Sequence, residues 1–234
     1  MLPTLSTGCS MVEIIAEISG NHDGSLDKAL SLITAAAIAG CDYAKFQFYR
    51  PEDMPDRHEG DNEKMYRKLM VPDDWLPELF LVAKAQAIGL FASVFSVRAV
   101  HELLKYDVPY IKVASPGSTR LSREVYLDIF ESVPPDVGII ASDFGAGTVS
   151  TDRQLYCPSG HPPTITISDL KLFSHRNYYG FSDHTPGIRA PLAFIRAGAK
   201  MIEKHLKLDD DCVDAAFSAD YETMKLLCKL ARKA

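Results

Sequence analysis

The sequence lacks the features that would assign it to a membrane, secreted or low-complexity class. No stretch approaches the roughly 18 consecutive apolar residues that cross a membrane. Residues 1–10 have neither the basic start nor the apolar centre of a secretory signal. Hydrophobic residues make up 47% of the 234 residues and charged residues 24%, the balance of an ordinary globular protein. We therefore expect a cytoplasmic protein with no membrane partner.

Cysteine and net positive charge are also scarce. The five cysteines are widely spaced, odd in number and without a C-x-x-C pair, which favours reduced thiols over a disulfide framework. Cys157 has no base near it in the sequence and is interpreted as a packing residue. A net charge of -6 argues against nucleic acid as the main partner. It leaves room for a small anionic substrate, because a local cluster of Lys and Ser can bind phosphate inside an acidic protein.

Short β-branched or aromatic runs alternate with longer helical stretches. This alternation predicts a parallel sheet, and eight repeats fit a single closed (β/α)8 barrel over residues 1–234. An open doubly wound sheet is the alternative, although no G-x-G-x-x-G follows the first strand. The expected strands are Met11–Ile18, Tyr43–Phe48, Leu90–Phe95, Tyr110–Ala114, Gly138–Ser142, Gln154–Cys157, Tyr178–Ser182 and Lys200–His205.

The helical stretches are less regular than the strands. The segment Arg50–Met70 is expected to be an insertion with a solvated loop and a short helix. The segment Asp143–Arg153 is too short and too rich in Gly and Thr for a covering helix, so we expect an irregular barrel without its fifth helix. Association into a homo-oligomer could cover the exposed strands. The expected helices are Ser25–Ala39, Asp73–Ile88, Val97–Lys105, Ser122–Glu131, Ile188–Ala197 and Ser218–Arg232.

Polar residues collect where the strands end, which is where parallel barrels place their active sites. We therefore predict a polar pocket at this edge. Its members are Glu17, Asn21, Lys45, Gln47, Ser93, Lys112, Ser115, Ser142, Cys157, Ser159, Ser182, Asp183, His184, Glu203, Lys204 and His205.

His184 and His205 end the last two expected strands, which would be neighbours in a closed barrel. Two imidazoles completed by water and substrate oxygens suit Mn²⁺, Fe²⁺, Co²⁺ or Zn²⁺ better than Ca²⁺ or Mg²⁺. The alternative for each histidine is a hydrogen-bonded structural role. The other five histidines, among them His58, His101 and His175, are interpreted as surface or loop residues.

Lys45 and Lys112 lie within strands, where lysine is seldom found unless it is paired. Either each pairs with a carboxylate such as Glu17 or Glu203, or the two clamp a phosphate and a carboxylate with help from serine hydroxyls. Glu203 could orient a ligand or relay a proton, or could instead form an ion pair with Lys204 or Lys45.

Six segments resemble motifs of the sialic acid synthase family, in the family's order, from about residue 11 to 220. The strongest matches are Gly180–Thr185 (G-F-S-D-H-T) and Ile202–His205 (I-E-K-H). The others are Ile14–Gly24, Lys45–Gln47, Ile111–Ser115 and, more loosely, Leu155–Ser159.

The resemblance implies a metal-dependent condensation of phosphoenolpyruvate with the open-chain aldehyde of N-acetylmannosamine or a related amino sugar. The products would be a nonulosonic (sialic acid-like) acid and phosphate. His184 and His205 would hold a divalent cation, with Mn²⁺ preferred and Co²⁺ or Mg²⁺ as alternatives. The family also implies a homo-oligomer.

The resemblance also assigns individual roles within the predicted pocket. Lys45 and Ser93 would hold the phosphoenolpyruvate carboxylate. The residues expected at its phosphate are Lys112, Ser115, Ser142 and Ser182. The positions near the sugar or the reacting centre are Glu17, Asn21, Gln47 and Asp214. The expected catalytic residues are Glu17, His184 and Glu203.

The sequence departs from the family pattern in several places. Gly117 follows Ser115 and Pro116 where the family has a glutamate, and His161 replaces a tyrosine. No counterpart of the family's C-terminal antifreeze-like domain is present in the 234 residues, and Arg120 or Arg189 would have to replace its arginine.

Two other functions therefore stay open. One is a synthase that uses a different aldehyde carrying a phosphate, which Arg50, Arg120 or Arg189 would bind. The other is a non-catalytic barrel that binds a ligand or a partner subunit.

Overall fold

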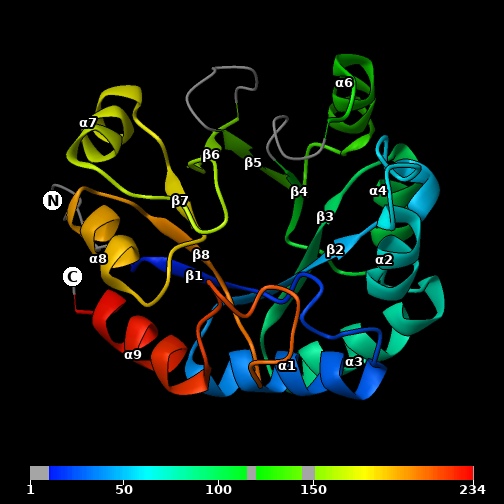
Figure 1. Cartoon of the computed structure of the whole chain (residues 1–234), viewed down its shortest axis with the longest axis horizontal. Coiled ribbons are helices and arrows are strands. Elements are labelled where there is room, and N and C mark those ends of the chain that lie inside the picture. The colour runs from blue at the N-terminus through cyan, green and yellow to red at the C-terminus, as the bar shows by residue number, and fades with distance from the viewer. Residues whose placement is uncertain (1–10, 115–119, 144–150, 234) are drawn as a thin grey trace, which may run out of the picture.

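The computed structural model describes residues 11–114, 120–143 and 151–233, and these build a closed barrel of eight parallel strands (Figure 1). Each strand pairs with the next in sequence, and β8 pairs back with β1. The predicted (β/α)8 barrel is confirmed, and the open sheet is wrong. The strands are β1 (Glu13–Glu17), β2 (Tyr43–Phe48), β3 (Gly89–Val94), β4 (Tyr110–Val113), β5 (Gly138–Asp143), β6 (Arg153–Tyr156), β7 (Gly180–Asp183) and β8 (Met201–His205).

Helices surround the barrel, and α9 touches both α8 and α1. Besides the 3-10 turns η1 (Pro51–Asp53) and η2 (Asp73–Trp75), the described helices are α1 (Leu26–Ala39), α2 (Asn62–Leu69), α3 (Leu76–Ala85), α4 (Val97–Leu103), α6 (Arg123–Ser132), α7 (Ile167–Arg176), α8 (Arg189–Arg196) and α9 (Tyr221–Ala231).

Strand alternation divides the core into two layers. Ile14 and Ala16 of β1 face outward and pack in the large cluster that the helices cover, whereas Ile15 between them faces inward. The inward layer fills the barrel below the strand ends and consists of Ile15, Phe91, Tyr110, Ile140, Leu155 and Met201. The described side chains therefore plug the barrel below the strand ends.

The helix α7 was not predicted. It begins at a capping box in which the hydroxyl of Thr166 accepts from the Asp169 backbone and the Asp169 carboxylate accepts from the Thr166 backbone. It ends at Asn177, which adopts the left-handed conformation. Both signals are local and could have been recognised from the residues Thr166-x-x-Asp169 and the asparagine.

The connection between β5 and β6 is short, as expected. β5 ends at Asp143 and β6 begins at Arg153, and most of the connection, residues 144–150, lies outside the described residues. The ring in Figure 1 has α6 and α7 on either side of this point, with no described helix between them. The prediction of a missing fifth helix therefore falls mainly on residues outside the described ranges.

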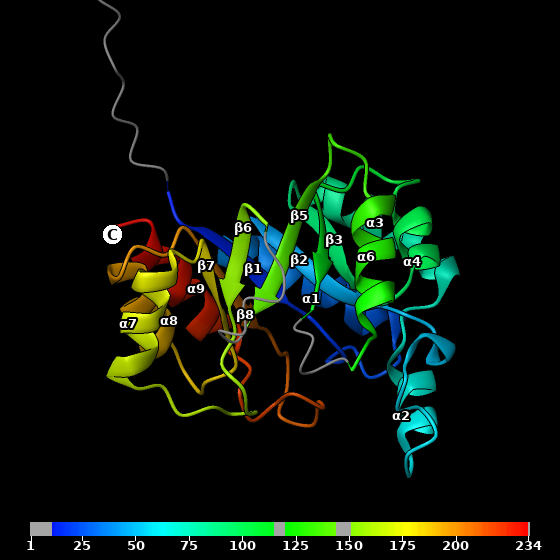
Figure 2. The same cartoon turned by 90° about the horizontal axis from the view of Figure 1, so that it is seen from above.

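The segment Arg50–Met70 is an insertion with a short helix, as predicted. Its helix α2 buries no residue and stands beyond the strand ends in Figure 2. No helix in the described part of the chain is long and apolar enough to span a membrane.

Candidate active site

A cavity of about 700 Å³ opens at the carboxyl ends of the strands. Every strand, or the residue that follows it, contributes polar side chains to its lining. The predicted site residues that line it are Glu17, Lys45, Gln47, Ser93, Lys112, Ser142, Ser182, His184, Glu203, His205 and Asp214. Ser115 lies outside the described residues, as do Pro116 and Gly117.

The floor of the cavity holds two lysines and two glutamates, Glu17, Lys45, Lys112 and Glu203, each at most 3% exposed. Lys45 pairs with Glu17, donates to Ser93 Oγ at 2.8 Å, and lies 3.7 Å from Glu203 Oε2. Lys112 Nζ lies 2.5 Å from Glu203 Oε1. Both lysines therefore have carboxylate partners, and the four charges balance.

Burial and ion pairing shift the pKa values of these lysines and glutamates in opposite directions. Burial lowers the pKa of Lys45 to about 7, although Glu203 favours its charged form. Burial alone would raise the pKa of Glu203, but the neighbouring ammonium groups of Lys112 and Lys45 hold it well below its usual range. The floor thus keeps its charge only because each charge has a close partner.

Two buried oxygen atoms of the cavity lining lack a hydrogen-bond partner among the described residues. They are Ser142 Oγ and Glu203 Oε2. The other oxygen of Glu203 accepts from Ser182 Oγ at 2.8 Å as well as from Lys112. Because buried polar groups are nearly always paired, the two atoms mark positions where water or a ligand would bind.

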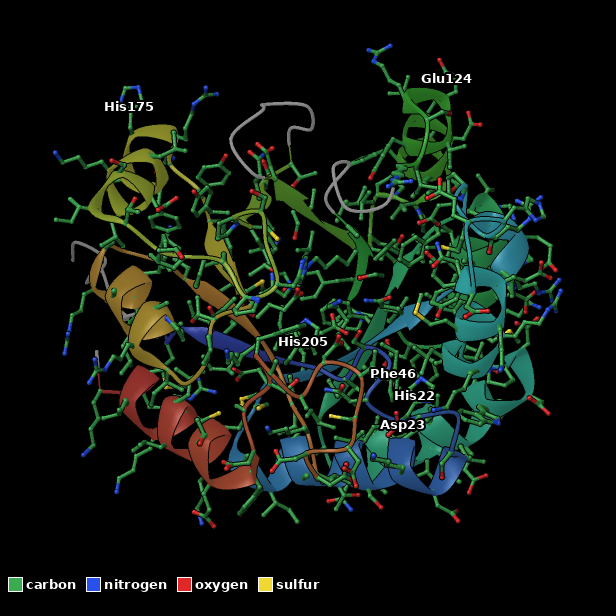
Figure 3. The ribbon with its side chains drawn as sticks, in the orientation of Figure 1. His22, Asp23, Phe46, Glu124, His175 and His205 are labelled. Carbon is green, nitrogen blue, oxygen red and sulfur yellow. The ribbon has the colours of Figure 1, made fainter. Side chains whose placement is uncertain are left out.

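His184 and His205 come from the ends of adjacent strands, and their rings lie 5.1 Å apart between centroids. Burial, reinforced by the neighbouring histidines, lowers the pKa of His184 to about 2, so its imidazole is neutral. His205 Nδ1 lies 3.1 Å from Asp214 Oδ2. The side chain of His205 lies near the centre of the barrel mouth (Figure 3).

These features fit a cation with two imidazole ligands. Metal-binding imidazoles must be neutral, and a carboxylate behind one ring is the usual partner of a metal-bound histidine. In the described ranges no group of three or more His, Cys, Asp or Glu side chains is placed to hold an ion. An ion at His184 and His205 would therefore need water or substrate oxygens, as the sequence pattern proposed.

Lys204 is a buried residue whose role the sequence did not indicate. Its Nζ lies 2.7 Å from Asp183 Oδ2 and donates to the carbonyl oxygens of Phe217, at 2.9 Å, and Thr185. Lys204 therefore ties the end of β7 to the segment around Phe217, which follows β8. The suggested Lys204–Glu203 ion pair is wrong, because consecutive strand residues point to opposite faces of the sheet.

Asn21 is fully buried and does not line the cavity. Its amide donates to the Leu206 carbonyl oxygen at 2.9 Å and to Ser218 Oγ at 3.0 Å. Its carbonyl oxygen accepts from the backbone nitrogen of Asp214 at 3.0 Å. Asn21 thus positions Asp214 from behind the cavity lining, and its place near the sugar or the reacting centre remains a prediction.

His22 lies in the turn between β1 and α1, so it is a loop residue as predicted, but it is buried rather than on the surface. Its ring is fully buried, 6.1 Å from that of Phe46 and 5.6 Å from that of Trp75. Burial lowers its pKa to about 4. Figure 3 shows His22 beside Phe46, whereas His175 projects from the outer face of α7.

Cys157 and His161 also lie beside His184. Cys157 Sγ is 3.9 Å from His184 Nδ1, and burial raises the pKa of the thiol to about 11. A protonated thiol is a poor nucleophile, which agrees with its interpretation as packing. The His161 ring lies 4.4 Å from that of His184, so the replaced tyrosine position does line the cavity.

The candidate arginines do not reach the cavity. Arg50 Nη2 lies 2.5 Å from Asp73 Oδ2, and Arg120 lies 2.9 and 3.0 Å from the two carboxylate oxygens of Glu59. Arg189 is exposed at the start of α8. Among the described lining residues there is no arginine, so the second phosphate site of the alternative synthase lacks these cations.

The chain is similar to known proteins over most of its length. The sequence profile of the NeuB family matches residues 32–124 and 156–234. Pseudaminic acid synthases from Campylobacter jejuni and Helicobacter pylori are 31% and 30% identical to the chain, over 95% and 94% of it and 74% of each relative. The N-acetylneuraminic acid (sialic acid) synthetase from Leptospira borgpetersenii, solved with citrate, superposes with a TM-score of 0.79 at 26% identity, over 95% of this chain and 83% of that one.

Proposed function

The chain belongs to the NeuB family, and from this premise we propose that it condenses phosphoenolpyruvate with the aldehyde of an N-acetylated amino sugar. The products would be a nonulosonic acid and inorganic phosphate. The observation that carries the proposal is the convergence of two buried lysines, Lys45 and Lys112, on the cavity floor beside three serine hydroxyls. The names of the relatives support the same class of reaction.

The carboxylate and phosphate of phosphoenolpyruvate would replace the floor carboxylates as partners of the two lysines. Lys45 and Ser93, already 2.8 Å apart, would hold its carboxylate. Its phosphate would be held by Lys112, Ser142 and Ser182, with Ser115 assigned by family position alone. Ser142 Oγ, which has no hydrogen-bond partner among the described residues, would gain one in this arrangement, and the substrate anion would offset the desolvation of both lysines.

We propose a divalent cation at His184 and His205, with Mn²⁺ preferred and Co²⁺ or Mg²⁺ as alternatives. The neutral state of His184 and the Asp214 carboxylate beside His205 support this assignment. When bound, the ion would act as a Lewis acid on the aldehyde oxygen of the acceptor.

The cavity residues would carry out the remaining steps. Carbon 3 of phosphoenolpyruvate forms the new bond to the aldehyde carbon, water adds at carbon 2, and the bond from carbon 2 to the phosphate oxygen breaks. The water loses both protons as its oxygen becomes the carbonyl oxygen at carbon 2: one goes to the aldehyde oxygen and the other to the departing phosphate. Glu17 and Glu203, the floor carboxylates, would take up and return protons, whereas Gln47 and Asp214 would lie beside the sugar.

The experiment that tests the function is phosphate release from phosphoenolpyruvate and N-acetylmannosamine with Mn²⁺. The acceptor used in pseudaminic acid synthesis serves as a second substrate. We expect release that needs a sugar, stops with EDTA and falls at least about 100-fold in His184→Ala. No release with any amino sugar would contradict the proposal and favour a non-catalytic barrel.

Two further expectations come from the sequence and remain proposals. The chain would form a homo-oligomer, and it would act in the cytoplasm. The mass in solution, measured by light scattering, tests the first; a monomer at micromolar concentration would contradict it.

A further inference from the structure

Two cysteine thiols meet at the seam of the barrel, where its last unit packs against its first. The chain itself joins each unit to the next, but the contacts of β8 with β1 and of α9 with α1 bring together residues far apart in sequence (Figure 1). Cys228 of α9 and Cys41, which follows the end of α1, lie across this seam with their Sγ atoms 3.7 Å apart. Both thiols are free, and they are 187 positions apart in the chain. A bond between them would therefore close the barrel at its seam.

The backbone on both sides of the seam is held in place by contacts other than those of the thiols. Asp42, next to Cys41, accepts from the Arg232 guanidinium at 2.7 Å. The same carboxylate oxygen accepts from the Ile14 backbone nitrogen at 2.7 Å. Arg232 lies one turn after Cys228, and its backbone nitrogen donates to the Cys228 carbonyl oxygen at 3.2 Å. The two thiols are thus held in contact, and a small rotation of both side chains would bring the sulfur atoms to bonding distance.

The pair also has the reactivity that disulfide formation requires. A hydrogen bond from the Cys41 thiol, with help from the Arg232 guanidinium, holds the pKa of Cys228 below its ordinary value, although burial opposes this shift. Because the thiolate is the form that attacks an oxidant, Cys228 is the nucleophile of the pair and Cys41 its resolving thiol. Cys212 is also buried, but its thiol donates to the Asp209 carbonyl oxygen at 3.5 Å. Cys212 therefore serves as a reference thiol for the pair.

We propose that Cys41 and Cys228 are a modification site, a thiol pair that a peroxide converts into a disulfide across the barrel seam. The Cys228 thiolate attacks one oxygen of hydrogen peroxide, which gives a sulfenic acid, and the other oxygen leaves and takes up a proton to give water. The Cys41 sulfur then attacks the sulfenic sulfur, so that the S–S bond forms, the S–O bond breaks and a second water leaves. In total two thiols lose two protons and two electrons, and the peroxide is reduced to two molecules of water.

The disulfide would stabilise the barrel without entering the candidate active site. Cys41 precedes β2, so the pair lies near the amino ends of the strands, and neither cysteine lines the cavity at their carboxyl ends. A cross-link restricts the unfolded chain more as the closed loop becomes longer, and this loop spans most of the 234 residues. We therefore expect oxidation to lower the equilibrium constant of unfolding at least about 30-fold. This expectation does not depend on the proposed function.

The test treats the folded full-length chain with hydrogen peroxide, followed by alkylation in denaturant, digestion and mass spectrometry. We expect a disulfide between the peptides of Cys41 and Cys228, and a higher urea midpoint of unfolding before reduction with dithiothreitol than after it. Dithiothreitol restores the thiols but not oxidised methionines, so the difference reports the disulfide. Cys228→Ser should abolish this difference. Cys212→Ser is the matched control and should retain it, because its thiol contacts a carbonyl oxygen rather than a second thiol.

Three results would overturn the proposal. Cys41 and Cys228 could both remain free for alkylation after peroxide treatment, the bond could form only when urea is present during oxidation, or the cross-linked chain could unfold at the same urea midpoint as the reduced chain. All three are measured on the wild-type chain, so they depend neither on the folding of a variant nor on phosphate release from phosphoenolpyruvate.

Discussion

The floor of the cavity and its apolar wall, which consists of Met54, Tyr66 and Phe95, are built in opposite ways. The floor buries four charged side chains on strands of a closed barrel, so each position is fixed by the register of its neighbours. The wall buries uncharged side chains, two of them on an insertion outside the barrel. We therefore expect that substitutions on the floor disturb the barrel, whereas substitutions in the insertion leave it intact.

The largest loss of activity and stability is expected from Lys112→Met, a substitution in the floor. Loss of its ammonium group leaves Glu203 buried with a weaker partner, Lys45 at 3.7 Å. We expect kcat/KM to fall by about 10²–10³-fold and the free energy of unfolding to fall by about 3–5 kcal/mol. Steady-state phosphate release and urea unfolding measure the two quantities.

The double variant Lys112→Met/Glu203→Gln separates these two effects. It removes both charges of the pair, so stability should return to within about 1 kcal/mol of wild type. Activity should stay lost. Recovery of activity in the double variant would mean that the floor is only structural.

The stability of the folded chain is expected to depend on pH through His22, which is buried against Trp75. The pKa of His22 is about 4 in the folded chain and 6.5 as the ordinary value, so the unfolded chain binds more protons between these limits. Stability must therefore decrease as the pH falls from 6.5 towards 4.

The size of this effect is about 2 kcal/mol between pH 6.5 and 5. Urea unfolding of wild type and His22→Gln at the two pH values measures it as a difference between the proteins, which removes the contribution of other groups. Equal pH slopes in the two proteins would show that the ring is not held neutral.

A smaller effect is expected from Asn21→Ala, which acts on the cavity through Asp214. Loss of three hydrogen bonds should lower the free energy of unfolding by about 1–3 kcal/mol. The KM for the sugar should rise several-fold, whereas that for phosphoenolpyruvate should not. Equal changes in both values would mean that Asn21 supports the fold alone.

Strand positions were predictable because the alternation of strand and helix is carried by every repeat. β2 was predicted to the residue, and the other strands within a few residues. The convergence of Lys45, Lys112 and Glu203 followed from the barrel, because parallel strands end at one edge. The helix α7 was missed because its signal is a local cap rather than a strong apolar period.

The burial and contacts of residues behind the site could not be predicted from the sequence in the same way. The burial of His22 depends on Trp75, which lies far along the chain, and the role of Asn21 depends on a segment nearly two hundred residues away. Lys204 looked like a partner of Glu203 because the two are adjacent in sequence. Its partner is Asp183, on the neighbouring strand. Contacts of this kind are set by tertiary structure and leave no spacing pattern.

The central claim is that the buried floor binds phosphoenolpyruvate, and calorimetric titration of phosphoenolpyruvate with Mn²⁺ and no sugar tests it most directly. The account predicts saturable binding to the wild-type chain and at least about 100-fold weaker binding to Lys112→Met/Glu203→Gln. Equal affinity for both proteins, or no binding to the wild type, would contradict the account.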